Sequence, residues 1–190
     1  LYDYLCLSGD SAFMDKNIRW LDTKAPNTVK DHAKRLLEYY LADENRGEHG
    51  LIKIKGGDWN DSINNAGLQG IGESVMVSCQ VVYILEIAQD IFSDDQELCE
   101  RYATKAAELK NNLRKHALND AGFLNGIFTD ARKWVFSNHD QDGAERLNCP
   151  VNSFGIIARI FETDELKKLF SKIEELKGPN GYRLFYPPLG

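Results

Sequence analysis

The sequence predicts a mainly α-helical fold, and three observations lead to this prediction. Apolar residues recur with a 3.6-residue period through most of the chain. Residues 74–91 are apolar around most of a helical circumference, which is typical of a helix enclosed by others. The periodic segments are mostly about ten to twenty residues long and are joined by short loops, as in helical arrays. One small hairpin is expected to interrupt this pattern.

The first part of the chain contains three expected helices. Residues 1–7 read as the end of a helix that stops near Ser8-Gly9-Asp10, and residues 11–21 form a short amphipathic segment. The sequence Pro26-Asn27-Thr28 is expected to start a clear helix over residues 29–43. A short strand is expected over residues 51–54.

The second part contains four more expected helices and the hairpin. Glu73 or Ser74 begins the most apolar helix, and Asp94-Asp95 caps the next, which runs to about Leu118. Residues 122–136 read as a hairpin and residues 138–148 as a polar loop. Pro150 is expected to start a helix that runs to Phe161, and Thr163 to cap a last one that runs to about Lys177. Tyr2, Tyr39, Tyr40 and Tyr83, at helical spacing, are expected in the core or between helices.

Composition excludes several classes of function. The chain of 190 residues is 43% hydrophobic and 27% charged, with a formal net charge of −6 and no run of basic residues. This balance argues against nucleic-acid and anionic-membrane partners. No apolar run approaches the ~20 residues that span a bilayer. We expect one soluble, cytoplasmic domain over residues 1–190, cut from a longer polypeptide because the chain opens in mid-helix.

The cysteines and histidines give no sign of a disulfide framework or a metal site. Cys6, Cys79, Cys99 and Cys149 are far apart in the sequence, and we interpret them as reduced, mostly buried thiols. The four histidines lack the spacing of metal ligands. No metal and no organic cofactor are therefore expected.

A glycine-rich stretch over residues 47–75 carries the functional signal. It contains Gly56-Gly57-Asp58-Trp59-Asn60-Asp61, in which two carboxylates flank an indole and a carboxamide. An apolar ring, hydrogen-bonding groups and an acid are what sugar-cleaving sites use. From these residues alone, a loop with Asp61 capping a helix over residues 62–66 is an equally good interpretation.

Three blocks in order resemble a known family. Residues 47–51 (Gly-Glu-His-Gly-Leu), 56–61 and 70–75 (Gly-Ile-Gly-Glu-Ser-Val) are similar to motifs of the cellobiose and chitobiose phosphorylases of glycoside hydrolase family 94. This family also contains the phosphorylase domains of cyclic β-1,2-glucan synthases. The resemblance implies an (α/α)6 barrel whose loops at one end form a sugar site. The seven expected helices correspond to about half of the twelve in such a barrel.

The resemblance also implies a reaction and assigns residues to it. These enzymes cleave a β-glycosidic bond with inorganic phosphate as co-substrate, invert the anomeric centre and release an α-sugar 1-phosphate. The general acid falls on Asp61 and a donor-sugar contact on Trp59. For Asn60 and Asp58 two interpretations stay open, hydrogen bonds to sugar hydroxyls or to backbone amides of the loop. Phosphate attacks without a base, so one carboxylic acid suffices, whereas an inverting hydrolase needs two carboxyl groups roughly 6.5–9.5 Å apart.

Weaker matches extend the expected site. Asn152 lies in a segment where the family usually has Gln-Ser-Trp, and Arg183 and Tyr186 resemble a loop that enters the substrate end of the barrel. We expect all three to bind substrate. The family usually has Gly where this chain has Ser62, and the hairpin lacks a Trp-Tyr-Arg-Ala-like string, so the acceptor sugar stays open. Glu73 is interpreted as a helix-start residue and His49 as a loop-packing residue.

The expected partners are an oligosaccharide, phosphate and the remainder of a larger polypeptide. The resemblance alone implies a homodimer. The family's phosphate-binding residues lie mostly beyond Gly190, so the isolated chain could be inactive. Two alternatives stay open at this point. One is an inverting glycoside hydrolase on the same barrel, and the other is a non-catalytic carbohydrate-binding fragment.

Overall fold

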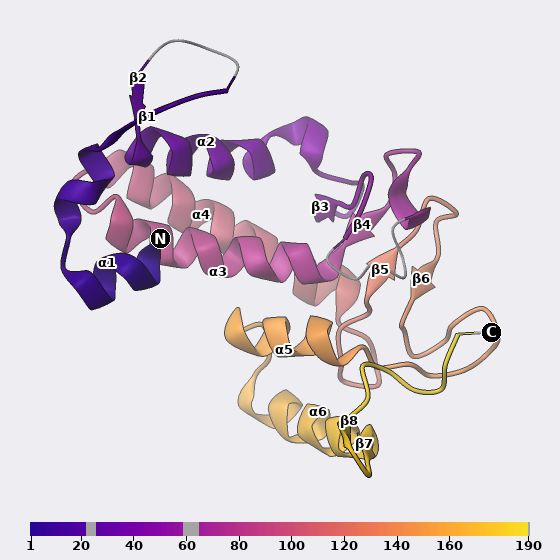
Figure 1. Cartoon of the computed structure of the whole chain (residues 1–190). Coiled ribbons are helices and arrows are strands. Elements are labelled where there is room, and N and C mark those ends of the chain that lie inside the picture. The colour runs from indigo at the N-terminus through magenta and orange to yellow at the C-terminus, as the bar shows by residue number, and fades with distance from the viewer. Residues whose placement is uncertain (22–25, 59–64, 190) are drawn as a thin grey trace.

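A computed structural model describes residues 1–21, 26–58 and 65–189. Its described part contains six α-helices and eight short strands (Figure 1). The helices are α1 Tyr2–Ser8, α2 Val29–Leu41, α3 Val75–Ile91, α4 Gln96–Asn112, α5 Cys149–Ile157 and α6 Thr163–Glu175. The strands are β1 Asn17–Arg19, β2 Pro26–Thr28, β3 Ile52–Lys53, β4 Glu73–Ser74, β5 Ile127–Phe128, β6 Trp134–Val135, β7 Lys177–Gly178 and β8 Gly181–Tyr182.

Helix α3 is the centre of the packing, as its apolar circumference predicts. It packs against α4, which returns alongside it after a short turn, and against α5 (Figure 1). Its fully buried residues include Val75, Cys79, Val82 and Leu85. They pack in the same core as fully buried residues of α4 such as Leu109. Burial of a Val or Leu side chain contributes about 1.5–3 kcal/mol, so this seam supplies much of the stability.

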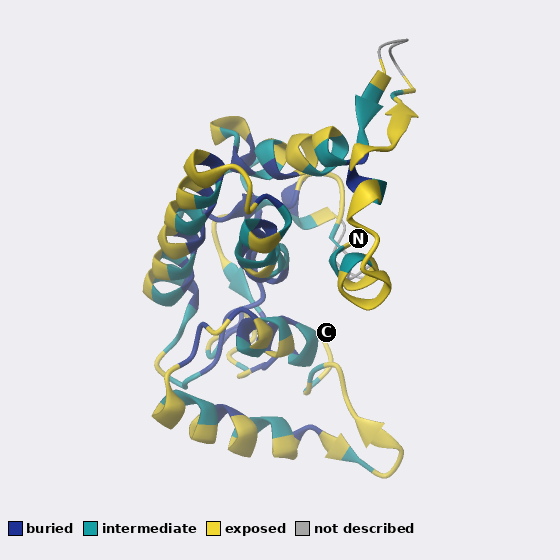
Figure 2. Ribbon diagram, turned by 90° about the vertical axis from the view of Figure 1, so that its left-hand side faces the viewer, coloured by how far each residue is buried: buried dark blue, intermediate teal, exposed yellow. Residues whose placement is uncertain are grey.

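The helices form an inner and an outer layer. Helices α2, α4 and α6 lie outside the row formed by α1, α3 and α5, and the yellow, exposed faces of α4 and α6 point outward (Figure 2). Successive helices therefore alternate between layers. Chain segments that leave α2 and α4 must pass over the same end of the array before α3 and α5 begin. Among the described residues, no helix is both long and apolar enough to cross a membrane.

A four-stranded antiparallel sheet covers the amino-terminal end of α3. Its order is β3-β4-β5-β6, with Glu73 opposite both Lys53 and Phe128, and Phe128 opposite Trp134. The hairpin predicted over residues 122–136 is confirmed as β5 and β6. The sequence did not predict that the hairpin pairs with β4 from the glycine-rich stretch, because such long-range pairing leaves no local signature.

The helix starts follow side-chain caps. Thr28 and Asp31 form a reciprocal capping box for α2, and Ser74 and Asp95 accept backbone N–H groups at the starts of α3 and α4. The predicted cap at Thr163 is wrong. Glu162 precedes α6 and exchanges hydrogen bonds with Glu165, so Thr163 is the first helical residue.

Two expected helical segments are shorter than predicted, and a third changes its helix type near its end. Residues 11–21 form only a 3-10 turn, Ser11–Asp15, before β1 pairs with β2. Helix α4 ends at Asn112 and continues as a wider π-helical turn, Leu113–Ala117. Helix α5 ends at Ile157, because a tight turn at residues 158–160 replaces the expected last helical turn.

The tyrosine prediction was partly wrong. Tyr39 is 51% exposed and Tyr83 is 37% exposed, although both lie at positions with helical spacing. Tyr39 packs edge-on against Tyr40, which itself packs against the core. The helical period gave the face on which these residues lie but not whether another element covers it.

Candidate functional site

The segments that carried the functional signal lie together at one end of the helices. The glycine-rich stretch, the hairpin, the loop over residues 137–148 and the carboxy-terminal segment all lie at the end where α3 and α5 begin (Figure 1). This arrangement follows from the two layers, because the outer helices α2 and α4 both end where the inner helices α3 and α5 begin. The candidate site is therefore built from loops on a rigid helical base.

Glu73 anchors the first motif block. Its fully buried carboxylate accepts the backbone N–H groups of His49 and Leu51, at 3.1 and 3.0 Å, and pairs with Nδ1 of His49 at 2.5 Å. Burial raises the pKa of Glu73, although these bonds favour the charged form. A Cβ at Gly47 would lie 2.4 Å from the Glu73 side chain, so the motif needs glycine there. Glu73 thus holds the loop, and Ser74 caps the helix.

Ser74 connects the second motif block to α3. Its hydroxyl donates to the Asp58 carboxylate and accepts the Val77 N–H at 3.1 Å. The neighbouring Ser78 hydroxyl accepts the Ile52 N–H at 2.9 Å. Consecutive side chains of β4, Glu73 and Ser74, therefore hold the two motif blocks that precede them in sequence.

Asp130, at the tip of the hairpin, anchors the far end of the same stretch. Its carboxylate accepts the backbone N–H groups of Gln69, Ile71 and Gly72, at 2.6, 3.0 and 2.9 Å. Partial desolvation opposes ionisation, but these three donors hold the pKa of Asp130 below its ordinary value. The segment between Asp58 and Gln69 is thus fastened at both ends. Sequence reasoning missed Asp130, because its partners are backbone groups about 60 residues away.

The structure describes only part of the predicted acid motif. Trp59, Asn60 and Asp61 lie outside the described residues, so their predicted roles stay predictions. Asp58 is described, and it lines a small cavity of about 10 Å³ together with Asn148 and Phe136. Asn148 caps α5 with its side-chain oxygen. Its buried amide nitrogen has no hydrogen-bond partner among the described residues.

Asn152 lies in the interior rather than on a pocket wall. Its side chain is fully buried, accepts the Leu124 N–H at 2.8 Å, and donates to the carbonyls of Leu124 and Asn148 at 3.2 and 2.9 Å. These bonds use both amide hydrogens. The side chain therefore ties the hairpin to α5.

Arg183 and Tyr186 lie together in the carboxy-terminal segment. The guanidinium carbon of Arg183 is 4.9 Å from the centre of the Tyr186 ring, a cation–π contact, and both side chains are reachable from solvent. The Arg183 N–H bonds to the Leu176 carbonyl at 3.0 Å. The structure therefore brings these two predicted residues together, whereas Asn152 is separate from them in the core.

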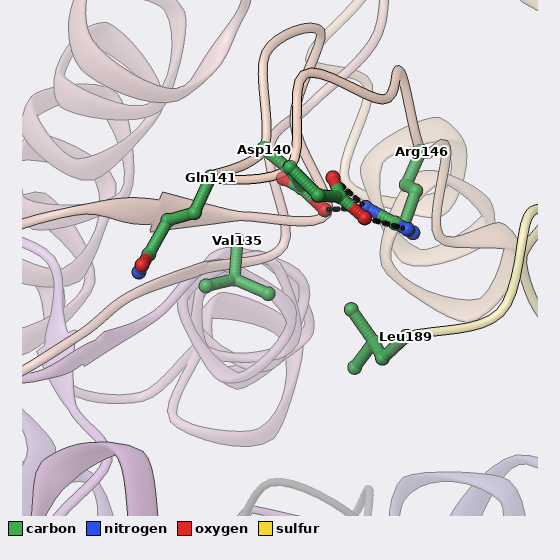
Figure 3. Close-up of a pocket in the computed structure, with 6 residues that line it drawn as sticks. Val135, Asp140, Gln141, Arg146 and Leu189 are labelled. Carbon is green, nitrogen blue, oxygen red and sulfur yellow. Dashed lines mark hydrogen bonds and ion pairs between the residues drawn. The ribbon is translucent and has the colours of Figure 1, made fainter.

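Arg146 fastens the loop over residues 137–148 to the carboxy-terminal segment, and sequence reasoning missed it. Its guanidinium bonds to Asp140 at 3.1 Å, to Asp142 at 2.5 and 2.7 Å, and to the carbonyls of Pro187 and Pro188 at 2.8 and 2.9 Å. Arg146, Asp140 and Asp142 border a pocket of about 230 Å³, together with Val135, Gln141 and Leu189 (Figure 3). The alternation of acids before Arg146 was the available signal, but it looked like a solvated loop.

An aromatic cluster lies behind the sheet. The His49 ring is 4.5 Å from Phe128, 5.4 Å from Trp134 and 4.9 Å from His116. Together with its bond to Glu73, this packing agrees with the interpretation of His49 as a loop-packing residue. Within the described residues, no group of three or more potential metal-binding side chains converges.

A comparison with known families identifies the chain. The family model for the Glycosyl hydrolase 94 superfamily, catalytic domain, matches residues 1–190. The chain belongs to this family. The resemblance seen in the three motif blocks is thereby confirmed, and so is the fold class, a mainly helical part of an (α/α)6 barrel catalytic domain with a small β-hairpin.

Characterised members of the Glycosyl hydrolase 94 family match nearly the whole chain. A solabiose phosphorylase from Paenibacillus borealis is 28% identical over 97% of this chain and 24% of its own length. A 3-O-beta-D-glucopyranosyl-beta-D-glucuronide phosphorylase from the same organism is 27% identical over 95% and 23%. A cellobionic acid phosphorylase from Neurospora crassa is 26% identical over 85% and 20%. The chain thus spans about a quarter or less of each of these relatives.

Solved structures support the fold alone. A rhamnosidase from Klebsiella oxytoca with rhamnose bound aligns with a TM-score of 0.58 at 15% identity, over 92% of this chain and 28% of that chain. A sugar epimerase from a ruminal bacterium gives the same TM-score and identity, over 83% of this chain and 39% of that chain. Both alignments therefore cover most of this Glycosyl hydrolase 94 chain.

Proposed function

We propose that the protein carrying this chain is an inverting β-glucoside phosphorylase. It would cleave a β-linked glucoside, such as a cellobiose-like disaccharide or a β-glucan, with inorganic phosphate and release an α-sugar 1-phosphate. The supporting observation is the anchoring of the motif stretch. Glu73 and Ser74 fasten it to the start of α3, and Asp130 fastens its far end, which is the kind of rigid support a catalytic loop needs.

In this proposal Asp61 is the general acid. It gives its proton to the glycosidic oxygen as the bond from that oxygen to the anomeric carbon breaks. A phosphate oxygen attacks the opposite face of the anomeric carbon and forms the new bond, so the configuration inverts. Because phosphate is already an anion, no second carboxylate is needed to activate it, unlike the water of an inverting hydrolase.

The other predicted residues take supporting roles. Trp59 provides the apolar face under the donor sugar, and Asn60 and Asp58 bind its hydroxyls. Arg183 and Tyr186 form part of the substrate end through their cation–π pair. For Asn152 we propose a positioning role instead of sugar contact, because backbone groups already occupy its carboxamide.

The proposal also covers the partners of the chain. The partners are an oligosaccharide, inorganic phosphate as co-substrate, the remainder of a larger polypeptide and a second copy in a homodimer. The reaction needs no organic cofactor or metal. The cytoplasmic location and the single domain over residues 1–190 stay predictions. The relatives' names include neutral acceptors and acidic ones, a glucuronide and an aldonic acid, so either class is a candidate acceptor.

The test is phosphate-dependent release of sugar 1-phosphate by the full-length protein from a panel of β-linked disaccharides. Asp61→Asn should lower the rate about 10²–10⁴-fold, the usual contribution of a general acid. Asp94→Asn, at an exposed position beyond the far end of α3, serves as the matched control. Release of free sugar without phosphate would favour a hydrolase, and sugar binding without turnover would favour a non-catalytic module.

A further inference from the structure

A second, larger hollow lies beside β6. Its volume is about 360 Å³, and its wall combines one aromatic residue with polar groups of the hairpin and the following loop: Asn125, Lys133, Trp134, Asn138, His139 and Gln141. The size suits a single sugar residue with its hydration. Gln141 also lines the Arg146 pocket of Figure 3, so the two hollows adjoin each other at this residue.

Trp134 gives this hollow an apolar wall of fixed orientation. The indole is half-buried, and its ring centre lies 5.2 Å from Phe128 and 5.4 Å from His49. These contacts hold the ring in place, because His49 is itself bonded to Glu73. A fixed indole is the surface on which the C–H face of a sugar ring stacks.

The carboxamides around the hollow have hydrogen-bonding capacity to spare. Asn125 is only 6% exposed, and its oxygen accepts from the Asn119 amide at 2.8 Å. Its amide nitrogen has no hydrogen-bond partner within the described part of the chain. The Asn138 and Gln141 side chains likewise make no hydrogen bond to the residues described. Asn125 is buried and Asn138 is half-buried, whereas Gln141 is exposed, so it is the first two amides that favour a ligand with oxygen acceptors.

The unpaired charge at the hollow is positive. Lys133 and His139 have no acidic partner among the described residues. The nearest carboxylate in sequence, Asp140, already bonds to Ser137 and Arg146. A lysine and a histidine without acidic partners on one wall of the hollow favour an anionic group on the ligand.

We propose that this hollow binds a sugar residue that carries a carboxylate, of the uronate or aldonate class. Trp134 stacks against the ring, the carboxamides bind its hydroxyls, and Lys133 with His139 binds the carboxylate. The inference rests on the proposed function, because it assigns this residue to the acceptor side of the substrate. The hollow lies at the end of the helices that carries the motif stretch, and Trp134 contacts it through His49.

The test is saturation-transfer NMR on the full-length protein with sodium glucuronate, sodium gluconate or glucose as the probe. The perturbing variant is the pair Lys133→Gln and His139→Gln, whose side chains make no contact that the fold needs. Lys167→Gln in α6, whose side chain is 75% exposed, is the control for lost positive charge. Asn138→Ala tests the hydroxyl contacts without changing the charge.

The expected result is saturation transfer to the acidic sugars, with affinity about tenfold lower in the double variant and unchanged in the control. In the reverse reaction, from α-glucose 1-phosphate, the double variant should raise KM for glucuronate and leave kcat and the KM for glucose unaltered. Equal binding of glucose, or no effect of the double variant, overturns the proposal. Phosphorolysis of neutral disaccharides is measured separately, so a failed acidic subsite and a failed phosphorylase are distinguishable.

Discussion

Replacement of Arg146 by methionine should release the loop over residues 137–148 and the carboxy-terminal segment together. The Arg146 and Asp140 side chains are only 3% and 4% exposed, so the variant leaves a buried carboxylate without its cation. Removal of one partner of a buried ion pair costs about 3–5 kcal/mol. The Ser137 N–H and hydroxyl still bond to Asp140, both at 2.9 Å, which favours the lower end of this range.

Hydrogen exchange measured by mass spectrometry on the full-length protein is the assay, because it reports local opening in a large molecule. A loss of about 3 kcal/mol corresponds to roughly 100-fold faster exchange. The Arg146 N–H, bonded to Ser137 in the wild type at 2.8 Å, lies in the affected loop. Peptides from α3 should keep their protection, since no Arg146 contact reaches that helix.

Two further variants separate the buried pair from the exposed one. Asp142 is 51% exposed, and although the Arg146 guanidinium holds its pKa well below the usual range, solvent screens the pair, so Asp142→Asn should raise the exchange rate far less than Arg146→Met. Adding Asp140→Asn to Arg146→Met removes the stranded charge and should recover part of the loss. Less than about threefold faster exchange in Arg146→Met, or an equal effect of Asp142→Asn, would refute the reasoning.

Three other predictions concern Gly47, Asn148 and His116. Gly47→Ala should displace the Glu73 side chain, because the new Cβ would lie 2.4 Å from it. This variant should abolish sugar 1-phosphate release. Gly56→Ala, whose Cβ would lie in open space, should keep this activity. Asn148→Ala should destabilise α5 by about 1 kcal/mol in thermal unfolding, and Asn148→Ser, which keeps a capping oxygen, should not. Burial, His49 and Lys115 lower the pKa of His116 below 6.5, so the unfolded chain binds more protons and stability should fall as pH drops below about 6.5. His116→Gln should flatten this profile in denaturant titrations, and parallel profiles would contradict the assignment.

The sequence by itself determined the fold class and where its elements begin. The 3.6-residue period and the caps at Thr28, Ser74 and Asp95 are local, so α2, α3 and α4 start where the sequence predicts. The three motif blocks also identified the family, which the match over residues 1–190 confirms. Local chemistry and ordered motifs were sufficient for both conclusions.

Only the tertiary structure decided how the site is held together. Glu73 looked like a helix cap and is a buried anchor for the loop before it, because β4 pairs with β3 and faces His49. Asp130 and Arg146 looked like ordinary loop residues, yet their partners are backbone groups and acids that the fold brings together. Asn152 looked like a sugar contact and is bonded to the hairpin. In each case the deciding partner is either distant in sequence or a backbone group, and a pattern of side-chain types contains neither.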